Sequence, residues 1–295
     1  MINNTTEDKT LELVIEAAEK KKPIGIFTWL CVAWLALNVA VALFAPFLPL
    51  QDPNSLESVP GLGISFHHLM GTDDLGRDIF GRLAWGSRIS LGVGIGAMAI
   101  AFGVGGPLGM LGAYRRGRLD VILSSVMFTL LAFPSIIAII GILSFWTPRS
   151  LSKIILVIGI SSIPLVYRVM RAATLSVGSR EFITAAKMQG ARDRRIVFRE
   201  LLPNVAPTGL SFLLFGIATV IALEGVLAFL GLSVPPDEAP SWGNMINDAR
   251  LSLNDVPQNW PLIIFPSVLL CLFILALNFA GDRLRSYFDV TEVKL

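Results

Sequence analysis

A polar, arginine-rich segment at residues 171–203 lies between two apolar stretches. Within it, 181–189 favours a short helix, in which the small residues Ala185 and Ala186 let another protein surface come close. Gly190 supplies a helix stop, because glycine readily adopts the left-handed conformation that ends many helices. These residue types at this spacing suit docking.

A second helix is expected directly after the glycine. Asp193 can cap it, and it should run over 194–202 and end at Pro203, which lacks an N–H and restricts the residue before it. Two short helices then meet at a glycine corner. On this local pattern alone, a helical hairpin held at the lipid headgroups by its arginines fits as well as a docking site.

Glu224 is the one acid in an otherwise apolar stretch. An unpaired charge inside a membrane is costly, so this carboxylate should face the helix bundle, a water-filled path or the outer interface. Glu224 is therefore a candidate for lining a translocation path or contacting a gate. A structural hydrogen bond near the outer end of its helix is the competing interpretation.

Motifs for catalysis are missing from the sequence. None of the seven lysines follows a glycine, so the chain has no G-x-x-x-x-G-K-[ST] phosphate loop, and it also lacks a nucleophile elbow, H-E-x-x-H and C-x-x-C. His67 and His68 read as a solvated pair in an outer loop, since two histidines make a poor metal site. We therefore expect no catalytic residue, no metal site and no cofactor in this chain.

The elements that position these residues are membrane helices. Apolar residues make up 54% of the 295 residues and charged residues 16%, against about 25% charged in typical soluble domains. Five uncharged runs exceed the roughly 20 residues that a membrane helix needs, and a weaker sixth at 154–167 contains Pro164. We expect an all-α integral membrane protein with six transmembrane helices, at 26–48, 88–113, 120–147, 152–170, 204–230 and 259–281.

The distribution of basic residues predicts the orientation. With six spans, 18 of the 24 lysines and arginines fall on one side, which by the positive-inside rule is the cytoplasm. The N-terminal segment 1–25, which resembles a cytoplasmic or surface helix, the loop 171–203 and the C-terminus 282–295 are then cytoplasmic. The segments 49–87 and 231–258 are external. The expected location is the plasma membrane, or the inner membrane of a cell that has two.

Two further features concern the shape of the helices. Residues 69–91 suggest a short amphipathic helix on the outer membrane surface, in which Asp74 or Asp78 caps the helix or pairs with Arg77 and Arg82, although a simple headgroup anchor would look the same. Four prolines within the apolar stretches can kink their helices: Pro134, Pro164, Pro207 and Pro266.

The loop also carries a family pattern. Thr184-Ala-Ala, three residues, Gly190, nine residues and Glu200-Leu-Leu-Pro resemble the EAA loop of ABC importer permeases, with Thr184 in place of a glutamate and Glu200 in place of an isoleucine. In that family the loop is a coupling helix that sits in a groove of the cytoplasmic ATPase. The resemblance implies an ATPase contact made by Glu181, Phe182, Thr184, Ala185, Ala186, Gly190, Asp193 and Pro203.

Three other stretches agree with this family. Residues 71–91 resemble the GTDxLGRD signature of the C-type permeases of dipeptide and oligopeptide (and nickel) importers, 227–243 resemble LSFLGLGVxPPxPSWG, and 278–289 resemble NxLGDxLRDxLD. The resemblance implies the permease fold and a subunit that forms half of a pathway for peptides or related small solutes. It also implies coupling of ATPase closure to alternating access.

The resemblance further implies partners. These are a second permease of the B type, two cytoplasmic P-loop ATPase domains that use ATP and magnesium, and an external substrate-binding protein, besides membrane lipid and without nucleic acid. Two alternatives remain at this point: a free-standing channel or secondary carrier whose 171–203 loop binds lipid or a scaffold, and a membrane-anchored assembly factor. A secondary carrier would be expected to bury several ionisable groups near the membrane centre, where only Glu224 is a candidate.

Overall fold

The computed structural model describes residues 25–56, 58–235, 238–252 and 260–292, and the regular elements in these ranges are helices. The predicted all-α fold is confirmed. The expected surface helix in 1–25 lies outside the described residues except for Gly25. The helices are α2 (Ile26–Phe44), η1 (Ala45–Phe47), α3 (Ile79–Arg115), α4 (Gly117–Ala132), α5 (Ser135–Phe145), α6 (Leu151–Gly178), α7 (Glu181–Met188), α8 (Asp193–Arg195), η2 (Ile196–Leu201), α9 (Leu202–Phe229), α10 (Trp242–Ser252) and α11 (Trp260–Glu292).

Five helical stretches of the described chain are long and apolar enough to cross a membrane: Ile26–Phe47, Ile79–Arg115, Leu151–Gly178, Asp193–Phe229 and Trp260–Phe288. A sixth span results if α4 and α5, which meet at a bend of 76°, are counted together. The stretch with the weakest apolar signal, at 154–167, thus lies in an uninterrupted helix of 28 residues.

The bend between α4 and α5 follows from Pro134. Phe133, the residue before it, has an extended backbone (φ −82°, ψ 129°), and Pro134 is the N-cap of α5. A proline disfavours the helical conformation in the preceding residue because its Cδ meets that residue's backbone. The kink expected at Pro134 is therefore a complete break, whereas Pro164, Pro207 and Pro266 lie inside continuous helices.

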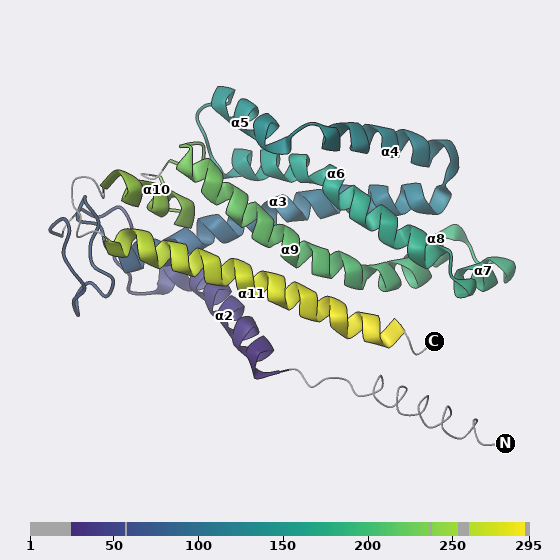
Figure 1. The fold of residues 1–295 in the computed structure, drawn as a ribbon, viewed down its shortest axis with the longest axis horizontal. Coiled ribbons are helices and arrows are strands. Elements are labelled where there is room, and N and C mark those ends of the chain that lie inside the picture. The colour runs from purple at the N-terminus through teal and green to yellow at the C-terminus, as the bar shows by residue number, and fades with distance from the viewer. Residues whose placement is uncertain (1–24, 57, 236–237, 253–259, 293–295) are drawn as a thin grey trace, which may run out of the picture.

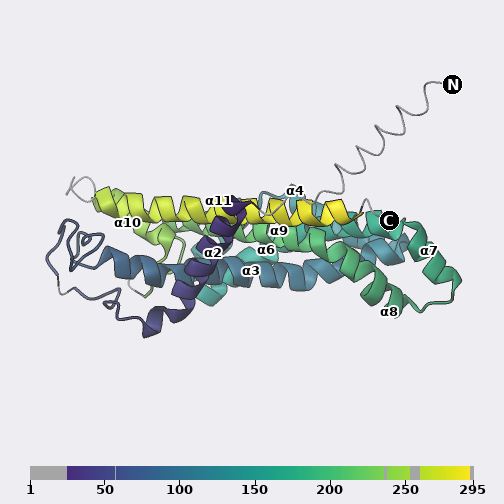
Figure 2. The same cartoon turned by 90° about the horizontal axis from the view of Figure 1, so that it is seen from below.

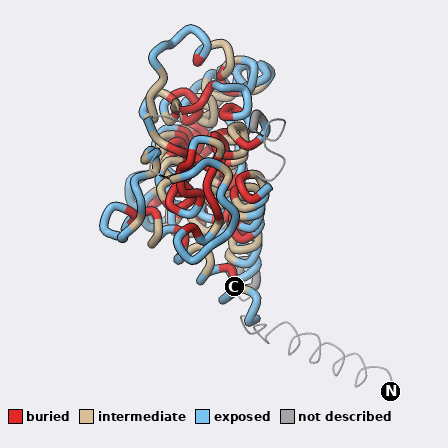
Figure 3. Tube along the Cα trace, turned by 90° about the vertical axis from the view of Figure 1, so that its left-hand side faces the viewer, coloured by how far each residue is buried: buried red, intermediate tan, exposed pale blue. Residues whose placement is uncertain are grey.

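The centre of the bundle is formed by α3, α6 and α9, and α3 packs most extensively against α6. Figure 3, which looks at the bundle from one end, shows buried residues gathered in its middle. A Cβ at Gly105 would lie 2.7 Å from the carbonyl oxygen of Ile163, and one at Gly109 would lie 2.6 Å from that of Tyr167. Glycine at these positions lets the two backbones touch, which is how membrane helices associate without a hydrophobic driving force.

The bundle is elongated, with different elements at its two ends. Figure 1 places α10 and the beginning of α3 at one end and α7 and α8 at the other. Figure 2 shows α2 crossing the bundle obliquely, where it packs against α11 and α3. Large apolar side chains of α2, such as Phe27 and Trp29, are exposed, as expected for a helix that faces lipid.

The expected amphipathic surface helix at 69–91 is wrong. Residues 69–78 form a compact loop with an isolated bridge between Thr72 and Asp78, and the helical part belongs to the long helix α3. Arg82, expected at the headgroups, is fully buried. Arg77 and Arg82, which suggested a water-facing surface, instead pair with acidic side chains inside the protein.

Candidate functional site

The glycine corner predicted in the arginine-rich loop is present in the structure. Gly190 has φ 75°, its N–H donates to the carbonyl of Lys187 at 3.0 Å, and the N–H of Ala191 donates to that of Ala186 at 3.1 Å. This pair of bonds is the Schellman motif, which ends a helix on a left-handed residue. The corner therefore fixes the direction in which the chain leaves α7.

The second half of the loop differs from its prediction. Asp193 begins α8 and makes no capping bond, and the helix does not end at Pro203 but continues from α8 through the π-helix η2 into α9. A proline inside an α-helix clashes with the carbonyl four residues earlier and leaves a hydrogen bond unmade. The wider π turns before Pro203 remove this conflict.

The helix α7 has a buried side and an exposed side. Ile183 is 1% exposed and packs into the main core cluster, and Ala186 is half-buried against the same cluster. The other candidate residues of the helix, Glu181, Phe182, Thr184 and Ala185, are exposed. One isoleucine thus fixes α7 to the bundle while a face of mostly small or polar residues stays available at the end of the molecule (Figure 1).

Tyr114, near the end of α3, contacts two residues of the 171–203 loop. Its hydroxyl donates to the Asp193 carboxylate at 2.7 Å, and the Lys187 ammonium lies 5.3 Å from the centre of its ring. Asp193 therefore anchors the loop to α3 instead of capping a helix. Sequence reasoning missed Tyr114, although an aromatic residue directly before basic residues at the end of an apolar span is a usable signal.

A second pair of contacts lies at the start of the 171–203 segment. The guanidinium of Arg171 donates two hydrogen bonds of 2.7 Å to the carboxylate of Asp120, and the hydroxyls of Tyr167 and Ser124 are 3.0 Å apart. Bidentate arginine–carboxylate pairs fix orientation as well as distance. The end of α6 is thereby held to the beginning of α4.

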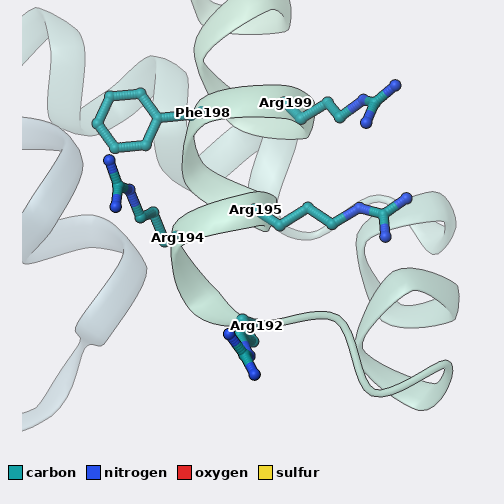
Figure 4. A pocket seen from close by; sticks show the side chains of 5 residues that line it. All are labelled: Arg192, Arg194, Arg195, Phe198 and Arg199. Carbon is teal, nitrogen blue, oxygen red and sulfur yellow. The ribbon is translucent and has the colours of Figure 1, made fainter.

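Beside α8 and η2 is a basic hollow of about 450 Å³ lined by Phe198 and four arginines, Arg192, Arg194, Arg195 and Arg199. In Figure 4 the Arg195 and Arg199 side chains extend in the same direction, and Arg194 lies beside Phe198. Within the described ranges these arginines form no ion pair. So much unpaired positive charge on one surface suits an acidic protein surface or phosphate groups.

Glu224 is fully buried at the other end of the bundle. The hydroxyls of Ser233 and Ser241 donate to its Oε1 at 2.6 and 2.8 Å, whereas its Oε2 has no hydrogen-bond partner. Gly243 lies close by, since a Cβ there would come within 3.4 Å of Oε2. The carboxylate thus connects α9 to the segment that leads into α10.

We expect Glu224→Gln to preserve the folded protein and Glu224→Leu to destabilise it by about 1–3 kcal/mol, because leucine leaves two buried hydroxyls without an acceptor. Thermal unfolding of the purified chain in detergent measures both. Equal melting temperatures for the glutamine and leucine variants would show that the serine hydrogen bonds contribute nothing to stability.

A buried ion network lies near Glu224, where α10 meets the beginning of α3. Asp73 pairs with Arg77 at 2.6 Å, Arg82 pairs with Asp248 at 3.2 Å, and Arg77 and Asp248 are 3.6 Å apart. Burial raises the pKa of Asp248, while Arg82 and Arg77 oppose that shift. His68 and Asp78 make a separate contact of 3.1 Å beside the start of α3.

This network was not foreseen as a unit. Asp78 does cap α3, since its Oδ2 accepts from the N–H of Gly81 at 2.7 Å. Arg77 and Arg82 pair with Asp73 and Asp248, however, and not with the carboxylates considered from the sequence. Among the described residues no cluster of three or more histidine, cysteine or acidic side chains could hold a metal ion.

The chain matches one known family along most of its membrane region. Residues 105–290 match the family described as "Binding-protein-dependent transport system inner membrane component". The dipeptide transport system permease protein DppC of Alkalihalophilus pseudofirmus is 36% identical over 85% of this chain and 81% of its own length. The glutathione transport system permease protein GsiD of Pectobacterium atrosepticum is 34% identical over 87% of this chain and 84% of its own.

The fold has relatives among solved structures. A chain from an inward-facing structure of the MetNI methionine ABC transporter superposes with a TM-score of 0.57 at 21% identity, over 71% of this chain and 96% of that one. At this identity the likeness concerns the fold alone. With the family match over 105–290, which includes the glycine corner and its ties, it leads to one conclusion: this chain belongs to the binding-protein-dependent transport system inner membrane components, the permease subunits of ABC importers.

Proposed function

We propose that this chain forms half of the translocation pathway of an ATP-driven importer of short peptides, paired with a second permease of the B type. Two cytoplasmic ATPase domains supply the energy with ATP and magnesium, and an external binding protein delivers the cargo. The curated relatives that transport dipeptides and glutathione support this cargo class. A binding-protein-dependent family argues against a free-standing channel or carrier.

The observation that carries the proposal is the two-sided helix α7. Ile183 is buried in the bundle, while Glu181, Phe182, Thr184 and Ala185 face outward beyond the end of the bundle. A rigid short helix with this arrangement passes a push from a docked ATPase into α6 on one side and α9 on the other. The proposed ATPase contact also includes Ala186, Gly190, Asp193 and Pro203.

The orientation belongs to the same proposal. If α7 and α8 contact ATPase domains, their end of the bundle is cytoplasmic, and both termini lie on that side. The basic residues of the loop support this direction. The opposite end, with Glu224 and the buried ion network, then receives the cargo. Glu224 is proposed to act at an outer gate, where its bonds to Ser233 and Ser241 hold the segment between α9 and α10 in place.

Co-purification and transport test the proposal together. The chain, purified from its native membrane in mild detergent, should bring a second permease and P-loop ATPases identifiable by mass spectrometry. Proteoliposomes of that complex should accumulate radiolabelled alanyl-phenylalanine only with ATP and the binding protein. Isolation of the chain alone from an intact preparation, or uptake without ATP, would contradict the importer assignment.

Tyr114→Phe should lower the transport rate about two- to tenfold, because it removes the hydroxyl that anchors Asp193, a loss of about 0.5–1.5 kcal/mol, but keeps the ring beside Lys187. Tyr114→Leu removes both contacts and should lower it further. Transport rate and ATPase rate are measured on the same preparations. Wild-type transport in both variants would exclude Tyr114 as a positioning residue.

A further inference from the structure

A hollow of about 610 Å³ lies between α6, α9 and α11, at the end of the bundle that carries the 171–203 loop. Three arginines from separate positions line it: Arg168 in α6, Arg180 directly before α7, and Arg285 in α11. Asp282 also lines it. The hollow is distinct from the basic hollow at Arg192–Arg199, since the two share no lining residue.

Besides Asp282, three kinds of lining group bear on what the hollow could bind. The guanidinium groups suit a carboxylate or a phosphate, since arginine binds either with paired hydrogen bonds. The Oδ1 atom of Asn278 is buried without a hydrogen-bond partner, so it can accept an N–H from a ligand. Phe212 and Phe215 add aromatic surface.

A peptide with a free carboxylate carries a chemical partner for each of these groups. Its carboxylate fits the arginines, an amide N–H fits Asn278, an α-ammonium fits Asp282, and an apolar side chain fits the phenylalanines. A bare phosphate offers no N–H to the buried acceptor. We propose that this hollow is a cytoplasmic exit site that holds the C-terminal carboxylate of a short peptide before release, an inference that rests on the proposed peptide cargo.

The position of the hollow also suggests how the peptide leaves. Arg180 is the residue before α7, so a movement of α7 changes the distance from Arg180 to Arg168 and Arg285, which lie on other helices. Separated arginines no longer share one carboxylate. Closure of the ATPases on α7 is therefore expected to weaken the site, which couples release to the ATP cycle.

The test uses the complete transporter, nucleotide-free and without binding protein, in phosphatidylcholine nanodiscs, with alanyl-phenylalanine as the probe. Arg168→Gln and Arg285→Gln should each weaken binding about tenfold or more, because each removes a charged hydrogen-bond donor. Arg283→Gln is the matched control: Arg283 is on α11, lies 5.0 Å from the Phe279 ring centre and does not line the hollow. Its affinity should stay within about twofold of wild type.

A change in the probe isolates the carboxylate. Alanyl-phenylalanine amide should bind the wild type about tenfold more weakly, and Arg168→Gln should then cause little additional loss, because the two changes remove the same contact. Additive losses, or equal binding of acid and amide, would overturn the proposal. Competition by added phosphatidylglycerol that disappears in Arg168→Gln would overturn it too, in favour of a lipid headgroup.

The transport assay separates this inference from the function itself. If wild-type proteoliposomes import alanyl-phenylalanine while the arginine variants bind it as the wild type does, only the exit site is wrong. If wild-type proteoliposomes import no peptide, the cargo assignment fails as well.

Discussion

Gly190→Val is expected to reduce ATP-driven transport at least about tenfold while the chain still inserts in the membrane. Gly190 has φ 75°, a conformation that costs a non-glycine residue about 1–3 kcal/mol and is least accessible to β-branched side chains. A Cβ at this position meets no atom within 4 Å, so the effect comes from backbone strain and not from a clash. Relief of the strain would break the Schellman bonds and turn α7 away from the orientation proposed for its ATPase contact.

The controls distinguish strain from a general defect. Gly190→Asn should retain much of the activity, since asparagine tolerates the left-handed conformation. Gly178→Val adds the same side chain at the end of α6, where the backbone φ is ordinary and a Cβ also meets nothing within 4 Å. The measurement is transport and ATP hydrolysis in proteoliposomes. Wild-type transport by Gly190→Val would remove the coupling role assigned to the corner.

The sequence predicted those parts of the site that depend on the backbone preferences of single residues. Gly190 forms the expected corner because the left-handed conformation is a property of glycine itself. Pro134 breaks its helix for a similarly local reason. Pro203 shows the limit of this reasoning, because the preceding π turns remove the clash that normally ends a helix at proline.

Contacts between distant parts of the chain could not be predicted in the same way. Arg82 and Asp248 are 166 positions apart, and the pattern around Arg82 alone suggested a helix on the membrane surface. Tyr114 and Asp193 are 79 positions apart, and the hydrogen bond between them was likewise not predicted. Burial of these polar groups becomes visible only when the helices that carry them are placed side by side.

The helix α3 connects the two ends of the molecule. It begins at the buried ion network, is 37 residues long, packs most extensively against α6, and carries near its end Tyr114, which binds Asp193 of the 171–203 loop. Because glycines let its backbone touch that of α6, a shift at either end meets a tightly packed neighbour. A change in the buried ion network is therefore expected to lower the stability of the protein.

Arg82→Met should destabilise the protein by about 3–5 kcal/mol, the usual cost of removing one partner from a buried ion pair. Arg82 is 0% exposed and its guanidinium lies 3.2 Å from Asp248 and 3.8 Å from Asp73. Methionine fills a similar volume but leaves the two carboxylates with Arg77 alone. Thermal unfolding in detergent, followed by size-exclusion chromatography after heating, measures the loss.

Two comparison variants identify the cause of that loss. Arg88→Met changes an exposed arginine of the same helix, 5.2 Å from the Trp85 ring centre, and should cost less than about 1 kcal/mol. Arg82→Met with Asp248→Leu removes both partners and should recover part of the stability, because no carboxylate of α10 is then left buried without Arg82. A double variant less stable than Arg82→Met alone would show that Asp248 supports α10 through other contacts and that charge pairing with Arg82 is not what holds α10 against α3.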